Sequence, residues 1–303
     1  MKVLITGGAG FIGSHIVDKF LDDNYEVVVL DNLTTGNLKN LDNKDIEFIN
    51  KDICDNDLNL EGVDVVIHHG AQINVRTSVE KPVYDGNTNV LGTLNILEKM
   101  RKYDVKKIIF ASSGGAVYGE PHYMPVDEKH PVAPMSPYGL SKFCGEEYIK
   151  LYNRLYGIDY TILRYSNVFG ERQDPMGEAG VISIFIDKIM NNQRPTIFGD
   201  GNQTRDFVYV GDVANANLMA LNWKNEIVNI GTGKETSVNE LYEVIAKELN
   251  YKDKPIYDKP REGEVYRISL NINKAEELGW KPSVDLKEGI KRTVEWMKGL
   301  KSL

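Results

Sequence analysis

The sequence predicts an α/β fold in which a doubly wound parallel sheet is followed by a smaller C-terminal lobe. Three observations predict it. The apolar run Lys2–Thr6 leads into a glycine-rich turn, short β-branched segments then alternate with amphipathic ones, and beyond about Tyr165 the chain loosens into Gly-, Pro- and Asp-rich loops. Alternation of strands and helices is typical of parallel sheets covered on both faces.

The first expected strand is Lys2–Thr6, and the turn after it carries Gly7, Gly10 and Gly13 before a helix that runs to Leu21. Glycine lets backbone N–H groups approach a pyrophosphate, and the positive end of the helix favours the same anion. Such glycines can also form a purely structural turn. The segment Glu26–Asp31, which comes next, favours binding of a dinucleotide.

That segment is the second expected strand, Glu26–Leu30, which ends beside Asp31, eighteen residues after Gly13. A carboxylate at this point can accept both hydroxyl groups of an adenine ribose and repels a 2′-phosphate. We therefore expect NAD rather than NADP as the cofactor.

Further strands and two long helices complete the expected order. The strands are expected at Ile46–Asn50, Val63–His68, Lys107–Ala111, Tyr160–Arg164 and Glu226–Ile230, and the helices at Asn89–Tyr103 and Ser136–Tyr156. We expect residues 1–165 to form the NAD-binding domain, rejoined by the strand near 226–230. Residues 166–303 are expected to form mainly a substrate-binding lobe.

Tyr138 and Lys142 are four residues apart, so on a helix they lie on the same face. Ser136 as N-cap and Pro137 at the first helical position place both near the helix start. A phenol with a pKa near 10 becomes a useful base only if positive charge stabilises the phenolate, and the ammonium of Lys142 supplies such charge. The spacing also occurs by chance on surface helices, but here it follows the dinucleotide pattern.

Composition narrows the classes of partner. The 303 residues include 36 Lys and Arg against 44 Asp and Glu, a net charge of −8, which disfavours nucleic acid. Cys54 and Cys144 have no metal-ligand spacing, so we expect neither a zinc site nor a disulfide. No apolar run approaches the length of a membrane span, and we expect a cytoplasmic protein without membrane contact.

In these motifs the chain resembles the extended short-chain dehydrogenase/reductases. Within that family it is most similar to the UDP-glucose (UDP-galactose) 4-epimerases. The likeness runs nearly from end to end. The motifs that carry it are Thr6–Gly13, Asp31-Asn32, Asp52-Ile53, His68–Ala71, Asn89–Thr93, Ser112–Gly119, Tyr138–Lys142, Arg164–Gly170, Gly199–Val210 and Arg261–Glu264.

The resemblance implies a Rossmann fold, bound NAD, a UDP-sugar substrate and a homodimer. It places NAD against Gly7, Gly10, Phe11, Ile12, Gly13, Asp31, Asn32, Asp52, Ile53, Ala71, Asn89, Tyr138, Lys142 and Tyr165, and the nucleotide sugar against Asn167, Arg205, Arg261, Glu264 and Ile268. The planar guanidinium groups of Arg205 and Arg261 can each bind two oxygens of a diphosphate. The alternative for each arginine is a salt bridge at the surface. His68 and His69 end an expected buried strand and are interpreted as structural.

One position departs from the family pattern. Where most members carry the catalytic Ser or Thr, four residues before the tyrosine of Val-Tyr-Gly, this chain has Gly114. We expect Ser113 to replace the missing hydroxyl, with Ser112 or an ordered water as alternatives. Related 4,6-dehydratases carry Asp-Glu at the next two positions, where this chain has Gly115 and Ala116, and that disfavours dehydration.

The resemblance implies inversion at C4 of UDP-glucose or UDP-galactose through a transient 4-keto sugar, with NAD regenerated in each turnover. Epimerisation of UDP-N-acetylglucosamine, or another reaction of the same family, is the alternative. Ile268 falls where the family lines the sugar's 2-substituent, so we expect partial exclusion of an N-acetyl group. An oxidoreductase that consumes NAD and a non-catalytic NAD sensor are the other classes; the sensor has no need for both Tyr138 and Lys142.

Overall fold

The computed structural model describes residues 1–175, 180–260 and 265–301. The chain divides into two compact units. The first unit consists of Met1–Gly119, Pro131–Tyr165 and Val213–Val228, and the second of Glu120–His130, Ser166–Asp212 and Asn229–Leu303. Compared with a boundary at residue 165, Glu120–His130 belongs to the second unit. The first unit regains Val213–Val228, which contains the start of the strand expected near 226–230.

The first unit is built on a seven-stranded sheet with the order β11-β6-β5-β4-β1-β2-β3. Its strands are β1 (Lys2–Thr6), β2 (Glu26–Leu30), β3 (Glu47–Ile49), β4 (Val65–His68), β5 (Lys107–Ser113), β6 (Asp159–Tyr165) and β11 (Glu226–Ile230). The pairs from β3 across to β6 are parallel. The order reverses between β1 and β4, and in such sheets ligands bind at the carboxyl ends of the strands beside this point.

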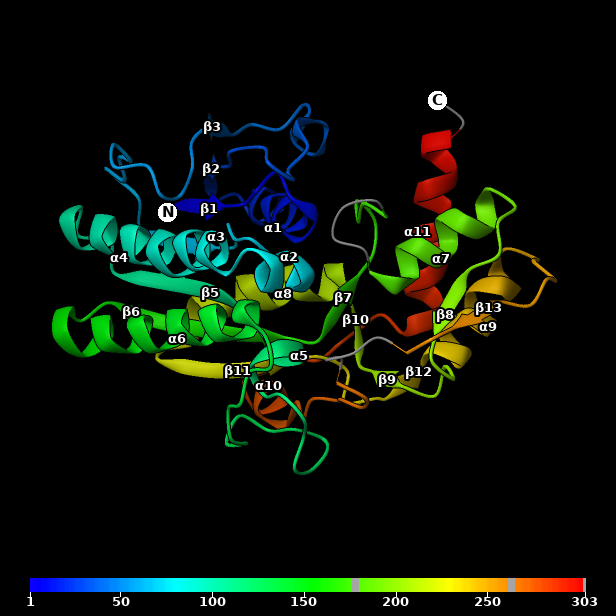
Figure 1. The fold of residues 1–303 in the computed structure, drawn as a ribbon. Coiled ribbons are helices and arrows are strands. Elements are labelled where there is room, and N and C mark those ends of the chain that lie inside the picture. The colour runs from blue at the N-terminus through cyan, green and yellow to red at the C-terminus, as the bar shows by residue number, and fades with distance from the viewer. Residues whose placement is uncertain (176–179, 261–264, 302–303) are drawn as a thin grey trace. The chain divides into compact units, whose positions relative to one another are not determined.

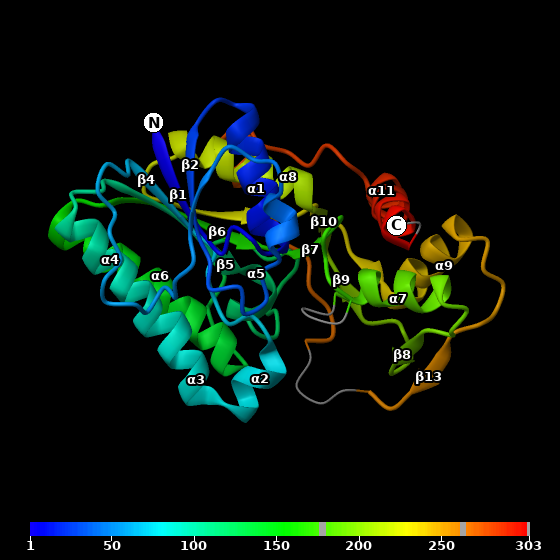
Figure 2. The same ribbon diagram turned by 90° about the horizontal axis from the view of Figure 1, so that it is seen from above.

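Helices cover both faces of the sheet (Figures 1 and 2). They are α1 (Phe11–Asp22), α2 (Val75–Glu80), α3 (Pro82–Gly86), α4 (Gly92–Lys102), α5 (Gly114–Val117), α6 (Pro137–Tyr156) and, from Val213 on, α8 (Val210–Met219), with short turns η1 (Leu38–Leu41), η2 (Asn87–Leu91) and η3 (Ala220–Asn222). On one face Ile96 of α4 and Ile149 of α6 pack with Ile108 and Ile162 of the sheet. Burial on both faces explains why the strands read as continuous apolar runs.

All seven expected strands form, three of them with the expected bounds. β5 continues two residues beyond Ala111 because its pairing with β6 extends to Ser113 opposite Tyr165. The helix expected from Asn89 begins as the π-helical turn η2 before α4. The helix expected from Ser136 forms as α6, with the Ser136 side chain accepting from Gly139 N.

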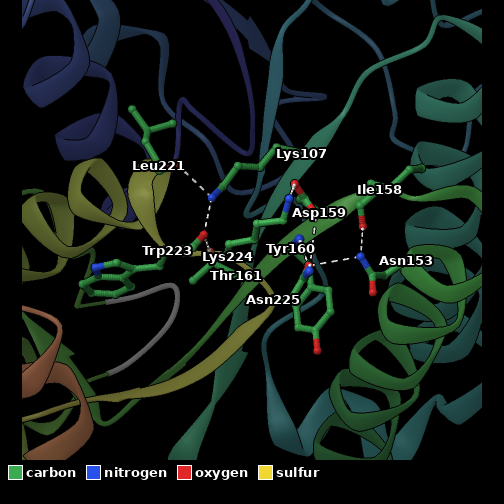
Figure 3. A network of polar contacts seen from close by, with 10 residues as sticks. All are labelled: Lys107, Asn153, Ile158, Asp159, Tyr160, Thr161, Leu221, Trp223, Lys224 and Asn225. Carbon is green, nitrogen blue, oxygen red and sulfur yellow. Dashed lines mark hydrogen bonds and ion pairs between the residues drawn. The ribbon is translucent and has the colours of Figure 1, made fainter.

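The segment between α8 and β11, which includes residues 221–225, is held to the sheet by the polar network in Figure 3. Lys107 Nζ on β5 donates to the carbonyls of Leu221, at 2.9 Å, and of Trp223. Asn225, in the left-handed conformation with φ of 57°, donates its backbone N–H to Tyr160 O at 2.8 Å. Burial lowers the pKa of Lys107 to about 8. These contacts tie residues 221–225, which lead from α8 to β11, to β5 and β6 of the sheet.

The second unit combines short strand pairs with three helices that pack on one another. Its elements are β7 (Asn167–Phe169), α7 (Val181–Met190), β8 (Thr196–Phe198), β9 (Thr204–Arg205), β10 (Phe207–Tyr209), β12 (Thr236–Ser237), α9 (Val238–Glu248), β13 (Ile256–Asp258), α10 (Asn273–Glu277) and α11 (Leu286–Lys301). β7 pairs with β10, β9 with β12, and β8 with β13. Across the described residues, no helix combines the length and apolar character needed to cross a membrane.

Candidate active site

The glycine turn after β1 is packed too tightly for side chains. Gly7 has a φ of 69°, and a Cβ there would lie 2.8 Å from Gly70 N; one at Gly13 would lie 2.1 Å from Gly7 O. Thr6 explains the closeness of Gly70, because its Oγ1 accepts from Gly70 N at 2.9 Å and from His69 N at 3.1 Å. The carboxyl ends of β1 and β4 are thereby joined beneath the first turn of α1.

Asp31, just after β2, is buried. Its two oxygens accept from Ala9 N at 2.9 Å and Leu33 N at 2.8 Å, and its burial raises its pKa. Each carboxylate oxygen keeps a second lone pair with which to accept from a ligand. Beside it, Asn32 Nδ2 donates to Asp52 Oδ2 at 2.6 Å, so the expected residues after β2 and β3 lie together.

These residues fit a bound NAD. The first N–H groups of α1 have no acceptor within the helix, its N-cap is Gly10, and the helix opens with Phe11 and Ile12 beside the side-chain-free turn. Ile53, which follows Asp52, packs under Gly92, where a Cβ would lie 2.7 Å from Ile53 Cδ1. The turn can approach a pyrophosphate, and Asp31 can accept from ribose hydroxyls.

The start of α6 carries Tyr138 and Lys142. Lys142 is buried; its Nζ donates to Ala111 O at 3.0 Å and lies 5.0 Å from the centre of the Phe110 ring. Burial lowers its pKa to about 8, against the opposing pull of the Asp85 and Glu146 charges. Tyr138 lies one turn earlier and is half-buried. The arrangement sets a cation near a phenol whose proton can be exchanged.

Ser112 and Ser113 differ sharply in surroundings. Ser112 is buried, and its hydroxyl donates to Glu146 Oε1 at 2.5 Å. Glu146 also receives two bonds from the guanidinium of Arg164, at 2.9 and 2.5 Å, within a buried ion pair. Ser113 is half-buried and is the N-cap of α5, without a side-chain cap bond, and Gly114 begins that helix. The hydroxyl adjacent to Gly114 is therefore that of Ser113.

Asn89 and Tyr165 lie inside polar networks. The side chain of Asn89 accepts from Gln72 N at 2.8 Å and donates to Gln72 O at 2.8 Å, fixing the loop that begins at Ala71. The Tyr165 hydroxyl accepts from Asn217 Nδ2 at 2.8 Å and contacts His69 Nε2 at 3.2 Å; burial raises its pKa.

His68, the last residue of β4, and His69, which follows it, are neutral. Burial lowers the pKa of both His68 and His69 to about 3. His68 is held between Thr6 Oγ1, 2.7 Å from Nδ1, and Thr93 Oγ1, 3.1 Å from Nε2. These bonds support the structural interpretation of the pair. Within the described residues, no group of three or more His, Cys, Asp or Glu side chains could hold a metal ion.

The expected substrate residues that the structure describes belong to the second unit. Asn167 opens β7 and donates its N–H to Asp206 O at 2.9 Å; Arg205 ends β9, with Nη1 bonded to Thr204 O at 2.8 Å; Ile268 is buried. Asp206 ties this region together, since its carboxylate accepts from Thr232 N at 2.8 Å and Leu270 N at 3.2 Å. Arg261 and Glu264 lie outside the described residues.

Several of these positioning residues had not been singled out from the sequence. Thr6 and Asp206 lie inside quoted motifs but were given no role of their own, and the residues outside every quoted motif are Gln72, Asp85, Glu146 and Asn217. Helical spacing offered a signal for two of them, since Asp85 is four residues before Asn89 and Glu146 four after Lys142. The others depend on contacts between distant segments.

Comparison with known proteins places the chain in a family. The model of the NAD dependent epimerase/dehydratase family matches residues 3–231. The chain is 74% identical over 300 residues to a putative UDP-glucose 4-epimerase of Methanocaldococcus jannaschii, covering 98% of both chains. It is also similar to the UDP-glucose 4-epimerase of Thermotoga maritima solved with UDP-glucose, with 45% identity, a TM-score of 0.97, and coverage of 99% of this chain and 100% of that one.

A second solved structure is the UDP-N-acetylglucosamine 4-epimerase of Methanobrevibacter ruminantium in complex with UDP-N-acetylmuramic acid. It shows 37% identity and a TM-score of 0.94, covering 99% of this chain and 98% of that one. Both family and fold thus match the Rossmann expectation drawn from the glycine turn. The chain is an enzyme of the NAD dependent epimerase/dehydratase family, and its cofactor is NAD.

Proposed function

We propose that this enzyme is a UDP-glucose 4-epimerase, which interconverts UDP-glucose and UDP-galactose by inverting C4 through a 4-keto sugar. The observation that carries the proposal is the start of α6, where Lys142, held by Ala111 O, lies one turn after Tyr138 in the unit that contains the glycine turn. Relatives named UDP-glucose 4-epimerase, over nearly the whole chain, support it.

In this mechanism Tyr138 removes the proton of the 4-hydroxyl group, and Lys142 stabilises the phenolate that does so. NAD, when bound, would supply a reversible acceptor for the C4 hydride. Ser113 donates a hydrogen bond to the 4-oxygen, in place of the side chain that Gly114 lacks. Asn167, Arg205 and, by resemblance, Arg261 hold the uridine diphosphate, and Glu264 faces the nucleotide sugar. With the diphosphate held, the 4-keto sugar can turn over, so that its other face would be presented for reduction.

The reaction leaves no net reduced cofactor. Product should therefore form with the absorbance at the NADH wavelength unchanged, at NAD concentrations far below that of the sugar. Stoichiometric growth of that absorbance would instead assign the chain to the net oxidoreductases of the family.

Substrate preference is the finer part of the proposal. We place Ile268 against the 2-substituent of the sugar, where a branched aliphatic chain leaves more room than a phenol but offers an amide no hydrogen bond. UDP-glucose and UDP-galactose are then the better substrates and UDP-N-acetylglucosamine a slower one. Gly115 and Ala116 supply no acid or base for dehydration.

Assembly as a homodimer in the cytoplasm belongs to the same proposal. Several large apolar side chains of the first unit are exposed, among them Val83 on α3, Leu91 on η2, and Leu140 and Leu155 on α6. α3 packs against α6. In the proposed dimer, a second copy of the chain buries these side chains.

Asp31→Ala should weaken NAD binding by at least tenfold and NADP binding much less. The carboxylate accepts hydrogen bonds from the ribose hydroxyls of NAD and repels the 2′-phosphate of NADP. Its removal therefore takes hydrogen bonds from NAD and removes an electrostatic repulsion from NADP. Titration calorimetry of each cofactor with both proteins measures this. Equal affinity of the unmodified protein for the two cofactors would contradict the role given to Asp31.

Ser113→Ala should lower kcat by about 10²–10⁴-fold, the scale of a positioned proton-transfer partner. Ser112→Ala is the matched control and should reduce kcat less, because the Ser112 hydroxyl is bonded to Glu146. Steady-state rates of the two variants give the comparison. Unchanged kcat in Ser113→Ala would transfer the role to Ser112 or to water.

A further inference from the structure

Asp85 on α3 is a buried carboxylate, 1% exposed, that no motif singled out. Its Oδ1 accepts from Gln72 Nε2 at 2.7 Å and from Asn89 Nδ2 at 3.0 Å. Its Oδ2 is buried without a hydrogen-bond partner, and among the described residues no cation forms an ion pair with it. A buried carboxylate without a countercharge is costly, so a fold that retains one requires an explanation.

The hydrogen bonds of Asp85 lead to the start of α6. Asn89 Nδ2, which donates to Asp85, also lies 3.2 Å from Ser141 Oγ. Ser141 immediately precedes Lys142, and its hydroxyl donates to Tyr138 O at 3.0 Å. The carboxylate is thus connected, through one amide and one hydroxyl, to the turn that carries both residues of the proposed reaction.

The charges around Lys142 single out Asp85. Glu146, on the same helix, also raises the pKa of Lys142, but less than Asp85 does, and its carboxylate is already paired with Arg164 in a bidentate contact. His68, the last residue of β4, and His69 are neutral at pH 7. The Asp85 charge acts on Lys142 in the direction that raises its pKa, against the lowering by burial. Asp85 is therefore the carboxylate that acts most strongly on the buried ammonium and is not paired with another cation among the described residues.

We propose that Asp85 is a positioning residue whose carboxylate keeps Lys142 protonated and, through Asn89 and Ser141, fixes the turn that carries Tyr138. The catalytic part of this inference rests on the proposed function. The charge coupling between Asp85 and Lys142 does not, and it can be measured without substrate.

The activity test compares Asp85→Asn with Glu80→Gln. An asparagine still accepts from Gln72 and Asn89 but carries no charge, whereas Glu80, exposed at the end of α2, loses its charge without facing Lys142. Removal of the Asp85 charge lowers the pKa of Lys142, so the alkaline limb of the kcat/KM profile should move to lower pH by about one unit. It should stay in place in Glu80→Gln. An unmoved limb in Asp85→Asn contradicts the proposal.

The substrate-free test is a double-mutant cycle on urea unfolding at pH 7, with Asp85→Asn and Lys142→Met. Asp85→Asn should raise the unfolding equilibrium constant about tenfold when Lys142 is present, and should leave it unchanged or lower it in Lys142→Met, where the carboxylate has nothing to balance. If Asp85→Asn alone fails to fold, recovery in the double variant has the same meaning. Equal losses in both backgrounds contradict the coupling, whatever the enzyme's substrate proves to be.

Discussion

Tyr138→Phe should lower kcat for C4 inversion by about 10²–10⁴-fold while NAD remains bound. The substitution keeps the ring and the helix but removes the group that exchanges the proton of the 4-hydroxyl. Initial rates with UDP-galactose, together with the NAD content of the purified variant, measure the effect.

Tyr148→Phe is the matched control, because Tyr148 lies on the same helix, α6, and is exposed. Its rate should equal that of the unmodified protein. Retention of full activity by Tyr138→Phe would overturn the assignment of the base, and an equal loss in both variants would show that α6 responds to any loss of a phenol.

Glu146→Ala should destabilise the protein by about 3–5 kcal/mol, the cost of leaving a buried charge unpaired. Glu146 and Arg164 are 0% and 3% exposed at their side chains, and Glu146 also accepts from Ser112. Loss of the carboxylate leaves the guanidinium buried with Tyr118 Oη, 3.0 Å from Nη1, as its neutral partner. Urea unfolding monitored by circular dichroism gives the free energy.

Glu147→Ala tests whether the effect is specific to the buried pair. Glu147 is the next residue, exposed and paired with Lys150 three residues on, and surface pairs contribute about 0–1 kcal/mol. A loss in Glu146→Ala no larger than that in Glu147→Ala would contradict the account of the buried network.

Most strands of the first unit could be predicted because they are short and largely buried apolar runs, as β1 is. The start of α6 could be predicted because Ser136 and Pro137 are local signals. A strand near 226–230 that rejoins the sheet could be expected in the same way, but the extent of the segment around it could not. Residues 213–228 belong to the first unit, and contacts such as that of Lys107 with Leu221 link positions more than a hundred residues apart.

The same limit applies within the site. Glycine spacing and Asp31 indicate a dinucleotide because that chemistry is local to one turn and one strand end. The choice between Ser112 and Ser113 is not local, since successive strand residues point to opposite faces and the partner of Ser112 is Glu146 on α6. The role of Asp85 could not be predicted, because it depends on a hydrogen bond with Gln72 and a charge interaction with Lys142 that form only in the folded chain.

The central claim is inversion at C4 of a UDP-hexose with NAD regenerated. It is tested most directly by incubating the purified protein with UDP-galactose, UDP-N-acetylgalactosamine and UDP-galacturonate in parallel and measuring the 4-epimers. We expect UDP-glucose to form fastest, with a slower reaction of the N-acetylated sugar and no accumulation of NADH. Preference for the N-acetylated or uronic sugar would contradict the proposed substrate, and absence of any 4-epimer would contradict the mechanism.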